Sequence, residues 1–396
     1  MNDPFRALYL HVPFCVRRCA YCDFHTRAVD RDDVQLEAHV DGLVASLRRA
    51  RVAGLLDAVE TVYVGGGTPT FLGTGRLGRL LAALPSGCAE LTVEANPESL
   101  TEDMAALLAG GGVTRVSIGV QSLDDAVLHT LGRTHDAARA RKAVSTAVGR
   151  IGNVSADVIC GVPGQSASSL RSTIEELLAL DVSHVSIYPL MVEEGTPLER
   201  AIEHGELPDV DDDVQASHME LAAEVLEAAG MARYEVASYA YPGHESRHNE
   251  AYWTGVPYLG LGEGAASMFD ASDFEEVARS GVFGPLGDPP EGAARVRIAR
   301  TGERPDMEFL TPEEIACEDA MLAMRMSAGI SRARLGRLAS TVPELIRAAD
   351  RAVELELACW QDGRLVPTQR GWLCGNELYG LFWDCARLWQ GVRLPR

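Results

Sequence analysis

The sequence contains little positive charge. Only one of its 36 basic residues is a lysine, Lys142, and 57 acidic residues bring the formal net charge to −21. Surfaces that bind nucleic acids depend on clustered lysine and arginine side chains, because these side chains neutralise the phosphate groups. We therefore expect no nucleic-acid partner.

Long apolar segments are also absent. No stretch approaches the roughly 20 consecutive apolar residues that a membrane-spanning helix needs. The N-terminus, Met1-Asn2-Asp3-Pro4, lacks the basic and then apolar pattern of a secretory signal. These two observations predict a cytoplasmic protein. They leave peripheral docking at a membrane open, because such docking needs no transmembrane segment.

Short β-branched runs alternate with amphipathic segments from residue 8 to about residue 188. The expected strands are Ala7–Val12, Glu60–Val64, Glu90–Glu94, Val113–Val120, Asn153–Ile159 and Ser183–Tyr188. The segments between them that we expect to be helical include Asp33–Ala50, Thr101–Ala109, Ala137–Val148 and Ala167–Leu180. Alternation at a spacing of roughly 30 residues predicts parallel strands joined by crossover helices.

This α/β pattern fits two architectures, a doubly wound sheet and a partial TIM-like (β/α)6 barrel. We favour the barrel, because polar residues recur just after most strands rather than at one point of the sheet. In βα barrels the active-site groups lie at the C-terminal ends of the strands. We expect the barrel and the segment that follows it to occupy residues 1–285.

The pattern changes after residue 285. Glycine and proline accumulate there, and Arg295–Ile298 reads as an exposed strand. We expect this stretch, residues 286–305, to be a linker between the barrel and a second domain.

Residues 306–396 predict a mainly helical, winged-helix-like domain. A helix begins at Thr311–Glu314, which supplies an N-cap, an early proline and a capping-box glutamate. Further helical patterns lie near 331–338 and 343–358, and a hairpin with an Asp362-Gly363 turn follows. The 11 arginines of this domain are balanced by 13 acidic residues, which argues against DNA binding.

Three of the nine cysteines are crowded together, while the other six are scattered. Cys15, Cys19 and Cys22 follow the first expected strand at spacings of four and three residues. Three thiolates can occupy three irons of a cubane cluster and leave the fourth iron free for a small-molecule ligand. Two other interpretations remain. The cysteines could line the buried face of a short helix, or His25 could complete a Cys3His zinc site.

Five motifs extend the pattern around these cysteines. They are Leu8–Cys15, Gly65–Thr70, Gly119–Ser122, Leu131–His135 and Asp157–Gln165. Their order is that of the oxygen-independent coproporphyrinogen III oxidase-like family of radical S-adenosylmethionine (SAM) proteins, which the chain resembles over residues 1 to about 270. The resemblance implies a [4Fe–4S] cluster on the three crowded cysteines and SAM at its open iron.

The resemblance also implies which residues hold SAM. By this comparison Gly66, Gly67 and Thr68 contact SAM at a turn where the glycines let the backbone approach a ligand closely. Glu94 ends the third strand and would accept a hydrogen bond from a ribose hydroxyl, as an acidic residue does in dinucleotide folds. The remaining candidates are Gln121 and Asp157 at later strand ends, Arg133 as the partner of a carboxylate, and Tyr9 and Tyr21 beside the cluster.

Two functions on this scaffold stay open. One is the oxidase of porphyrin biosynthesis, in which a radical from SAM cleavage starts the decarboxylation of coproporphyrinogen III. The other is a heme chaperone, which binds heme and delivers it to client proteins. The oxidases carry a further cysteine two residues after Cys22, where this chain has Phe24. The chaperone branch carries an HNxxYW motif, which is present as His248–Trp253. We therefore favour the chaperone.

The chaperone branch implies heme as the cargo and heme-accepting proteins as partners. Imidazole is a competent ligand for heme iron, so His248 is our candidate ligand, and in a helix it would share a face with Tyr252. The chain departs from the family at Ala266, where a histidine is usual. If that histidine helps to bind heme, the affinity of this chain for heme differs from that of family members that carry the histidine. Formation of a homodimer is left open by the sequence.

Overall fold

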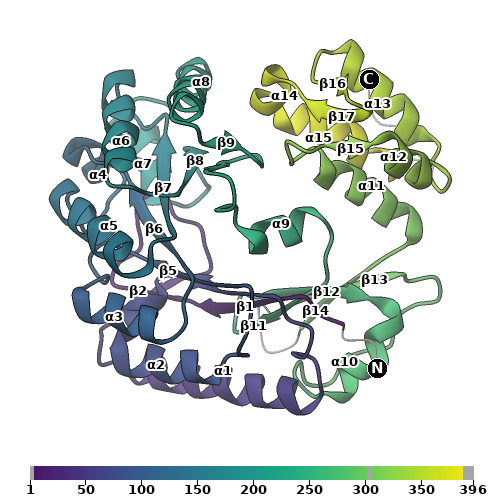
Figure 1. Cartoon of the computed structure of the whole chain (residues 1–396), viewed down its shortest axis with the longest axis horizontal. Coiled ribbons are helices and arrows are strands. Elements are labelled where there is room, and N and C mark those ends of the chain that lie inside the picture. The colour runs from purple at the N-terminus through teal and green to yellow at the C-terminus, as the bar shows by residue number, and fades with distance from the viewer. Residues whose placement is uncertain (1–3, 301–304, 387–396) are drawn as a thin grey trace.

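Twelve strands of the described residues form the main sheet. The sheet curves through the N-terminal part of the protein (Figure 1). The computed structural model describes residues 4–300 and 305–386. Six parallel strands stand in sequence order at the centre of the sheet, and all six were expected, with small shifts at their ends. They are β1 (Ala7–Val12), β4 (Thr61–Gly66), β5 (Glu90–Ala95), β6 (Arg115–Gln121), β7 (Val154–Cys160) and β8 (His184–Pro189).

Helices connect each of these strands to the next. They are α1 (Val34–Val52), η1 (Pro69–Leu72), α2 (Gly73–Ala83), α3 (Glu102–Gly110), α4 (Asp125–Thr130), α5 (Ala137–Ile151) and α6 (Ala167–Ala179). α2 and α4 were not among the expected helical segments. Since the strand order never reverses, the sheet has no switch point of the doubly wound kind. The partial (β/α)6 barrel is confirmed.

Side chains alternate along the barrel strands between the helices and the barrel interior. On β4, Val62 and Val64 are fully buried in the main hydrophobic core, which the helices cover. Thr61 and Tyr63 face the other way, because both contact His248 on the far side of the strand. The barrel interior is therefore partly polar. The C-terminal ends of its strands are where binding sites of such barrels lie.

The sheet continues past the barrel on both sides. Beyond β8 it adds β10 (Ser238–Ala240) and β9 (Ala232–Arg233). Beyond β1 it adds β11 (Tyr258–Leu261), β12 (Ala266–Asp270), β13 (Arg295–Ala299) and β14 (Asp306–Leu310). The connecting helices are α7 (Pro197–Glu203), α8 (Asp212–Ala228), α9 (Arg247–Trp253), η2 (Ala271–Asp273) and α10 (Phe274–Arg279).

The strand that we expected to be exposed in a linker is part of this sheet. β13 pairs with β12 on one side and β14 on the other, and Val296 and Ile298 are fully buried. Arginine alternating with apolar residues is typical of a strand with one solvent face, but here Arg295 is buried as well. Residues 301–304 of the expected linker lie outside the described residues. The main sheet ends only at Leu310, beyond the boundary expected at 306.

The C-terminal part has its own hydrophobic core, which includes Cys317, Leu345 and Phe382. Its elements are α11 (Pro312–Ala323), β15 (Ile330–Ser331), α12 (Arg332–Ala339), α13 (Glu344–Glu354), β16 (Ala358–Gln361), β17 (Arg364–Pro367), α14 (Gln369–Leu373) and α15 (Gly375–Trp383). The three strands form a small sheet, and the capping box at Thr311 is present as expected. Residues 387–396 of this expected domain lie outside the described residues. No helix in the described part of the chain could cross a membrane.

Buried ion pairs join the C-terminal part to the main sheet. Arg295 Nη1 on β13 lies 2.8 Å from Glu318 Oε2 and 3.2 Å from Asp319 Oδ1, both on α11. Arg297 also contacts Glu318. The Arg295 and Glu318 side chains are 7% and 5% exposed. Removing Glu318 would leave the buried Arg295 with Asp319 as its remaining carboxylate partner.

We expect Glu318→Ala to lower the free energy of unfolding by about 2 kcal/mol, less than the usual cost of breaking a buried ion pair, because Asp319 still contacts Arg295. The measurement is denaturant unfolding followed by circular dichroism. Glu275→Ala is the matched control, because the Glu275–Arg279 pair is largely exposed and its removal should have little effect. Equal losses in both variants would contradict the importance of the buried pair.

Candidate cluster and cofactor site

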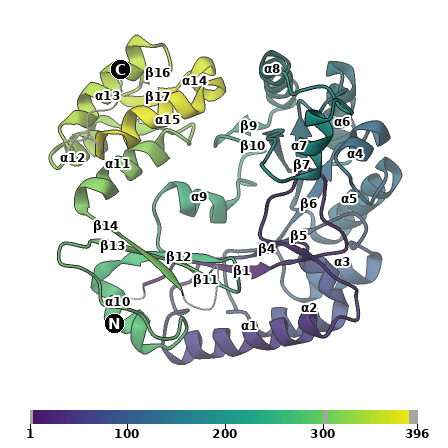
Figure 2. The ribbon, with the colours of Figure 1, turned by 180° about the vertical axis from the view of Figure 1, so that it is seen from behind.

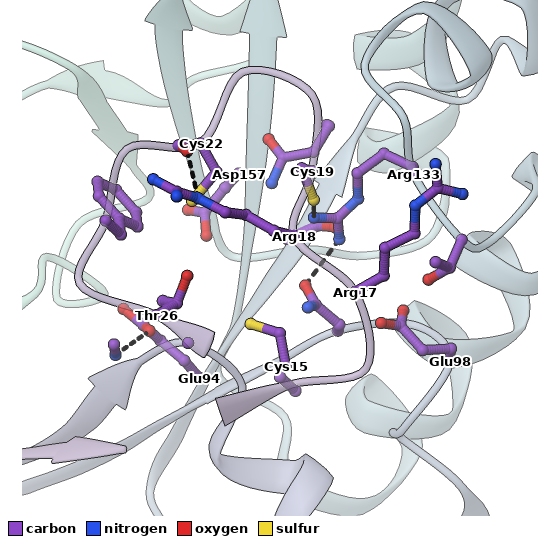
Figure 3. Close-up of a pocket in the computed structure, with 18 of the residues that line it drawn as sticks. Cys15, Arg17, Arg18, Cys19, Cys22, Thr26, Glu94, Glu98, Arg133 and Asp157 are labelled. Atoms are coloured by element: carbon purple, nitrogen blue, oxygen red, sulfur yellow. Dashed lines mark hydrogen bonds between the residues drawn. The ribbon is translucent and has the colours of Figure 1, made fainter. Parts of the chain in front are cut away.

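A pocket opens at the C-terminal ends of the barrel strands (Figure 3). Its empty space, with open solvent included, is about 760 Å³. Most of the residues predicted for the cluster and SAM line this pocket together: Cys15, Cys19, Tyr21, Cys22, Gly66, Gly67, Glu94, Gln121, Arg133 and Asp157. Phe24 also lines the pocket and is 67% exposed.

Cys15 ends a short strand, and Cys19 and Cys22 lie on the irregular loop that follows it, so none of the three lies on a helix. β2 (Phe14–Cys15) pairs in parallel with β3 (Arg27–Ala28) and closes the base of the loop. Arg18 Nε donates to the carbonyl of Cys22 over 2.8 Å, and the N–H of Ala20 donates to Leu131 O over 3.0 Å. These bonds hold the thiols around one pocket, so the interpretation as buried cysteines on a helix face is wrong.

The glycine turn lies directly against this loop. A Cβ atom on Gly67 would lie 2.7 Å from Phe14 O and 3.0 Å from Cys15 Sγ, and one on Gly66 would lie 2.6 Å from the ring of His11. Gly66 also has a φ of 116°, which other residues rarely adopt. Only glycine therefore allows the turn to approach Cys15 this closely.

Three thiols in one pocket fit a cubane cluster with one open iron. Burial raises the pKa of the Cys15 thiol to about 11 and raises the pKa of Cys22 as well. Thiolates are the metal-binding form, so these cysteines need positive charge nearby. Arg133 Nη1, 3.3 Å from Cys19 Sγ, supplies one such charge, and iron would supply the rest. No fourth cysteine lines the pocket.

The zinc alternative is not supported by the position of His25. Its Nε2 atom lies 3.1 Å from Glu263 Oε1, and Arg27 contacts the same carboxylate. His25 is not among the residues that line the pocket with the cysteines. Among the described residues, no three His, Cys, Asp or Glu side chains converge as for a single metal ion.

Two carboxylates form the floor of the pocket. Glu94 accepts hydrogen bonds from the Tyr63 hydroxyl at 2.7 Å and from the N–H of Gly66 at 2.9 Å. Asp157 accepts from the Ser117 hydroxyl at 3.3 Å. Burial raises the pKa of Glu94 to about 7 and that of Asp157 to about 6. Both side chains can therefore change protonation state near neutral pH.

Arg133 ties the cysteine loop to the strand ends. Besides the Cys19 thiol, its guanidinium donates to Asn96 Oδ1 at 2.7 Å and to Gly119 O at 2.8 Å. Although burial opposes the charge, the neighbouring Cys19 helps to raise the pKa of Arg133. Arg133 Nε is buried and has no partner among the described residues. Asn96 was not predicted as a site residue, although it is a polar residue directly after the end of β5.

Three predicted residues do not line the pocket. Thr68 is buried behind the pocket wall, 3.5 Å from Cys15 Sγ, and accepts a hydrogen bond from Asn96 Nδ2 at 2.7 Å. The Tyr9 hydroxyl meets His11 Nδ1 at 2.9 Å, one layer below the pocket. His248 lies deeper in the barrel, on α9, and is described below.

Comparison with known proteins gives this site a family. The model of the Radical SAM superfamily matches residues 9–177. A protein of Mycobacterium tuberculosis (strain CDC 1551 / Oshkosh) named heme chaperone HemW is 38% identical over 386 residues, which cover 95% of this chain and 94% of that protein. The heme chaperone HemW of Bacillus subtilis (strain 168) is 31% identical over 396 residues, which cover 95% and 99%. This chain belongs to the HemW family.

The HemW family lies within the radical SAM superfamily, which implies SAM and a [4Fe–4S] cluster as cofactors. Among solved structures, coproporphyrinogen III oxidase (HemN) from Escherichia coli superposes with a TM-score of 0.74, over 96% of this chain and 90% of that chain. The two sequences are only 18% identical. This likeness shows that the HemW family chain and that oxidase share a fold.

The HNxxYW segment of this HemW family chain is helical and forms α9. His248 is 1% exposed, and both of its ring nitrogens have partners. Nδ1 lies 3.0 Å from Thr61 Oγ1, and Nε2 lies 3.1 Å from the Tyr252 hydroxyl. His248 and Tyr252 therefore share a helix face, and they contact each other there.

We expect Cys15→Ala, Cys19→Ala and Cys22→Ala each to prevent cluster assembly, since each removes one of three thiolate ligands. After anaerobic reconstitution, each variant should lack the iron, the sulfide and the absorbance at about 400 nm that the cluster gives. Cys359→Ala is the matched control, because Cys359 is exposed on β16, outside the pocket. Protein that contains zinc and takes up no iron would refute the cluster assignment.

Proposed function

We propose that this protein is a heme chaperone, which binds heme and transfers it to client proteins. One observation carries the proposal: relatives named heme chaperone HemW are up to 38% identical to the chain over 95% of its length. A match of this extent includes the barrel, the site and the C-terminal part together. That the partners are heme-accepting client proteins stays a prediction.

In this proposal Cys15, Cys19 and Cys22 hold a [4Fe–4S] cluster. With three thiolate ligands, such a cluster keeps one iron open for SAM and can supply an electron to it. The chain's own residues prepare the pocket for both groups. Arg133 holds the loop of Cys19 in place, and Tyr21 forms part of the pocket wall.

The SAM cradle in this proposal consists of Gly66, Gly67, Glu94, Gln121 and Asp157, all of which line the pocket. The glycine turn brings backbone close to the ligand, and the two carboxylates accept hydrogen bonds from its hydroxyl or amino groups. Tyr9 and Thr68 stay predictions for direct SAM contact, and their positions support an indirect role behind the cradle.

Phe24 favours the chaperone over the oxidase. The oxidases carry a cysteine at this position, whereas here an exposed phenylalanine lines the pocket. A benzyl group cannot serve as a ligand or transfer a proton, but it offers an apolar surface that can contact a flat porphyrin. Arg17 and Arg18 line the same pocket and could attract anionic propionates despite the net charge of −21.

His248 remains the predicted heme ligand. Because its side chain is buried, the structure around it would have to change before it could bind iron. For its Nε2 atom to bind iron, the contact with Tyr252 at 3.1 Å must first break. The pKa of His248 is lowered to about 3 by burial, so the ring is neutral, which is the state that can bind metal. Ala266, where the family has histidine, lies exposed at the start of β12.

SAM affinity should rise with pH through about pH 7. Below this pH Glu94 is protonated, because burial raises its pKa to about 7, and it then accepts hydrogen bonds less well. Between pH 8 and pH 6 we expect the affinity of the reconstituted protein to fall by up to about tenfold. Calorimetric titration with SAM measures this, and Glu94→Gln should lose this part of the pH dependence. If SAM affinity in that variant depended on pH as in the natural protein, Glu94 would not be the group whose ionisation controls SAM binding.

Heme binding and oxidase activity can be measured in the same preparation of the protein. We expect the reconstituted protein to bind hemin stoichiometrically in a Soret titration and to form no protoporphyrinogen from coproporphyrinogen III with SAM and a reductant. Ala266→His should bind hemin more tightly if the family histidine contributes to the site. Formation of protoporphyrinogen would instead support the oxidase.

A further inference from the structure

Helix α9 lies between the main sheet and the C-terminal helices (Figure 1, Figure 2). Its N-terminus is fixed by Glu90, at the start of β5. The Glu90 carboxylate accepts hydrogen bonds from the backbone N–H groups of Arg247, at 3.0 Å, and His248, at 3.2 Å. α9 is thus anchored at the N-terminal ends of the strands, while the cofactor pocket lies at their C-terminal ends.

A line of contacts connects these two ends. The ring of His248 stacks on the ring of Tyr63, with 5.1 Å between centroids and an interplanar angle of 29°. The Tyr63 hydroxyl donates to Glu94 Oε1 over 2.7 Å, and Glu94 Oε2 accepts the N–H of Gly66 over 2.9 Å. Only two side chains, Tyr63 and Glu94, therefore separate His248 from the glycine turn.

Two neighbouring rings stack on Tyr63. Tyr9 stacks on it at 6.1 Å and 29°, and His248 stacks on it at 5.1 Å and 29°. His248 cannot rotate freely, because Thr61 and Tyr252 engage its two nitrogens. Loss of the imidazole would leave a space beside Tyr63, and the phenol could then tilt away from Glu94.

We propose that His248 and Tyr63 are positioning residues of the SAM site, through which the HNxxYW helix holds Glu94 and the glycine turn in their binding geometry. The inference rests on the proposed SAM cradle and does not depend on heme binding. A positioning role is compatible with the buried place of His248, because the contacts from His248 to Tyr63 and from Tyr63 to Glu94 stay intact in it.

The prediction concerns the strength and the pH dependence of SAM binding. The Tyr63 hydroxyl donates to the ionised form of Glu94, so its removal should raise the pH at which SAM binding is half-maximal. The other titratable groups that act on Glu94 are Tyr9, Arg115, Asp157, Tyr188 and Tyr252. The variants below leave all of these in place.

The test is calorimetric SAM titration of the reconstituted protein from pH 6 to pH 8.5. Tyr63→Phe keeps the stacked ring but removes the donor, and we expect a roughly tenfold loss of SAM affinity and a higher midpoint pH. His248→Ala should shift the midpoint in the same direction, with a smaller loss of affinity. His248→Phe restores an aromatic face beside Tyr63 and should recover part of both.

Tyr258→Phe is the matched control. Tyr258 packs against Tyr252 at 4.6 Å, so the variant removes a hydroxyl from the same aromatic group without touching the contact line. Its SAM affinity and midpoint pH should equal those of the natural protein. Iron content and the unfolding midpoint of each variant show whether the cluster and the fold are intact.

The outcomes separate this inference from the cradle on which it rests. If Glu94→Gln weakens SAM binding while Tyr63→Phe and His248→Ala leave affinity and midpoint pH unchanged, the positioning role is refuted and the cradle stands. If Glu94→Gln also has no effect, the cradle itself is wrong. Loss of hemin binding in His248→Ala with unaltered SAM binding would favour an iron ligand instead.

Discussion

Two backbone hydrogen bonds join the glycine turn to the chain before the cysteines: Gly67 N–H to Val12 O and Thr68 N–H to Phe14 O, both at 2.8 Å. They continue the β1–β4 pairing beyond the strand ends, so that the first cysteine and the turn form one surface. This close approach is possible only without a Cβ on the turn. If the distance between the glycine turn and Cys15 increased, the thiols and the SAM cradle would no longer share a pocket.

Below that surface, the barrel interior is unusually polar. Barrels of this kind commonly fill their interior with branched apolar side chains, whereas here Arg115, His184 and His248 are almost fully buried. Each histidine uses both ring nitrogens, and His184 lies between Ser155, at 2.7 Å, and the Tyr234 hydroxyl, at 2.8 Å. Hydrogen bonds on both nitrogens fix the orientation of each histidine ring, and this rigidity is what a positioning role requires.

Several contacts attach the C-terminal part to the rest of the chain. Arg295 on β13 pairs with Glu318 on α11, and Arg233 on β9 lies 5.1 Å over the ring of Trp372 on α14. Both edges of the main sheet therefore contact the C-terminal part. α9 lies between them, so a change in how the C-terminal part sits would reach the helix that carries His248.

The sequence alone determined the strand positions, the cysteine loop and the glycine turn, because β-branched runs, thiol spacing and consecutive glycines act locally. Tertiary structure decided the partners of Arg133 and Glu94, the burial of β13 and the enclosure of His248. These depend on contacts between residues far apart in the chain, such as Thr61 with His248. Local patterns show that a histidine is present on a helix, but only the packed barrel decides whether its nitrogens are free.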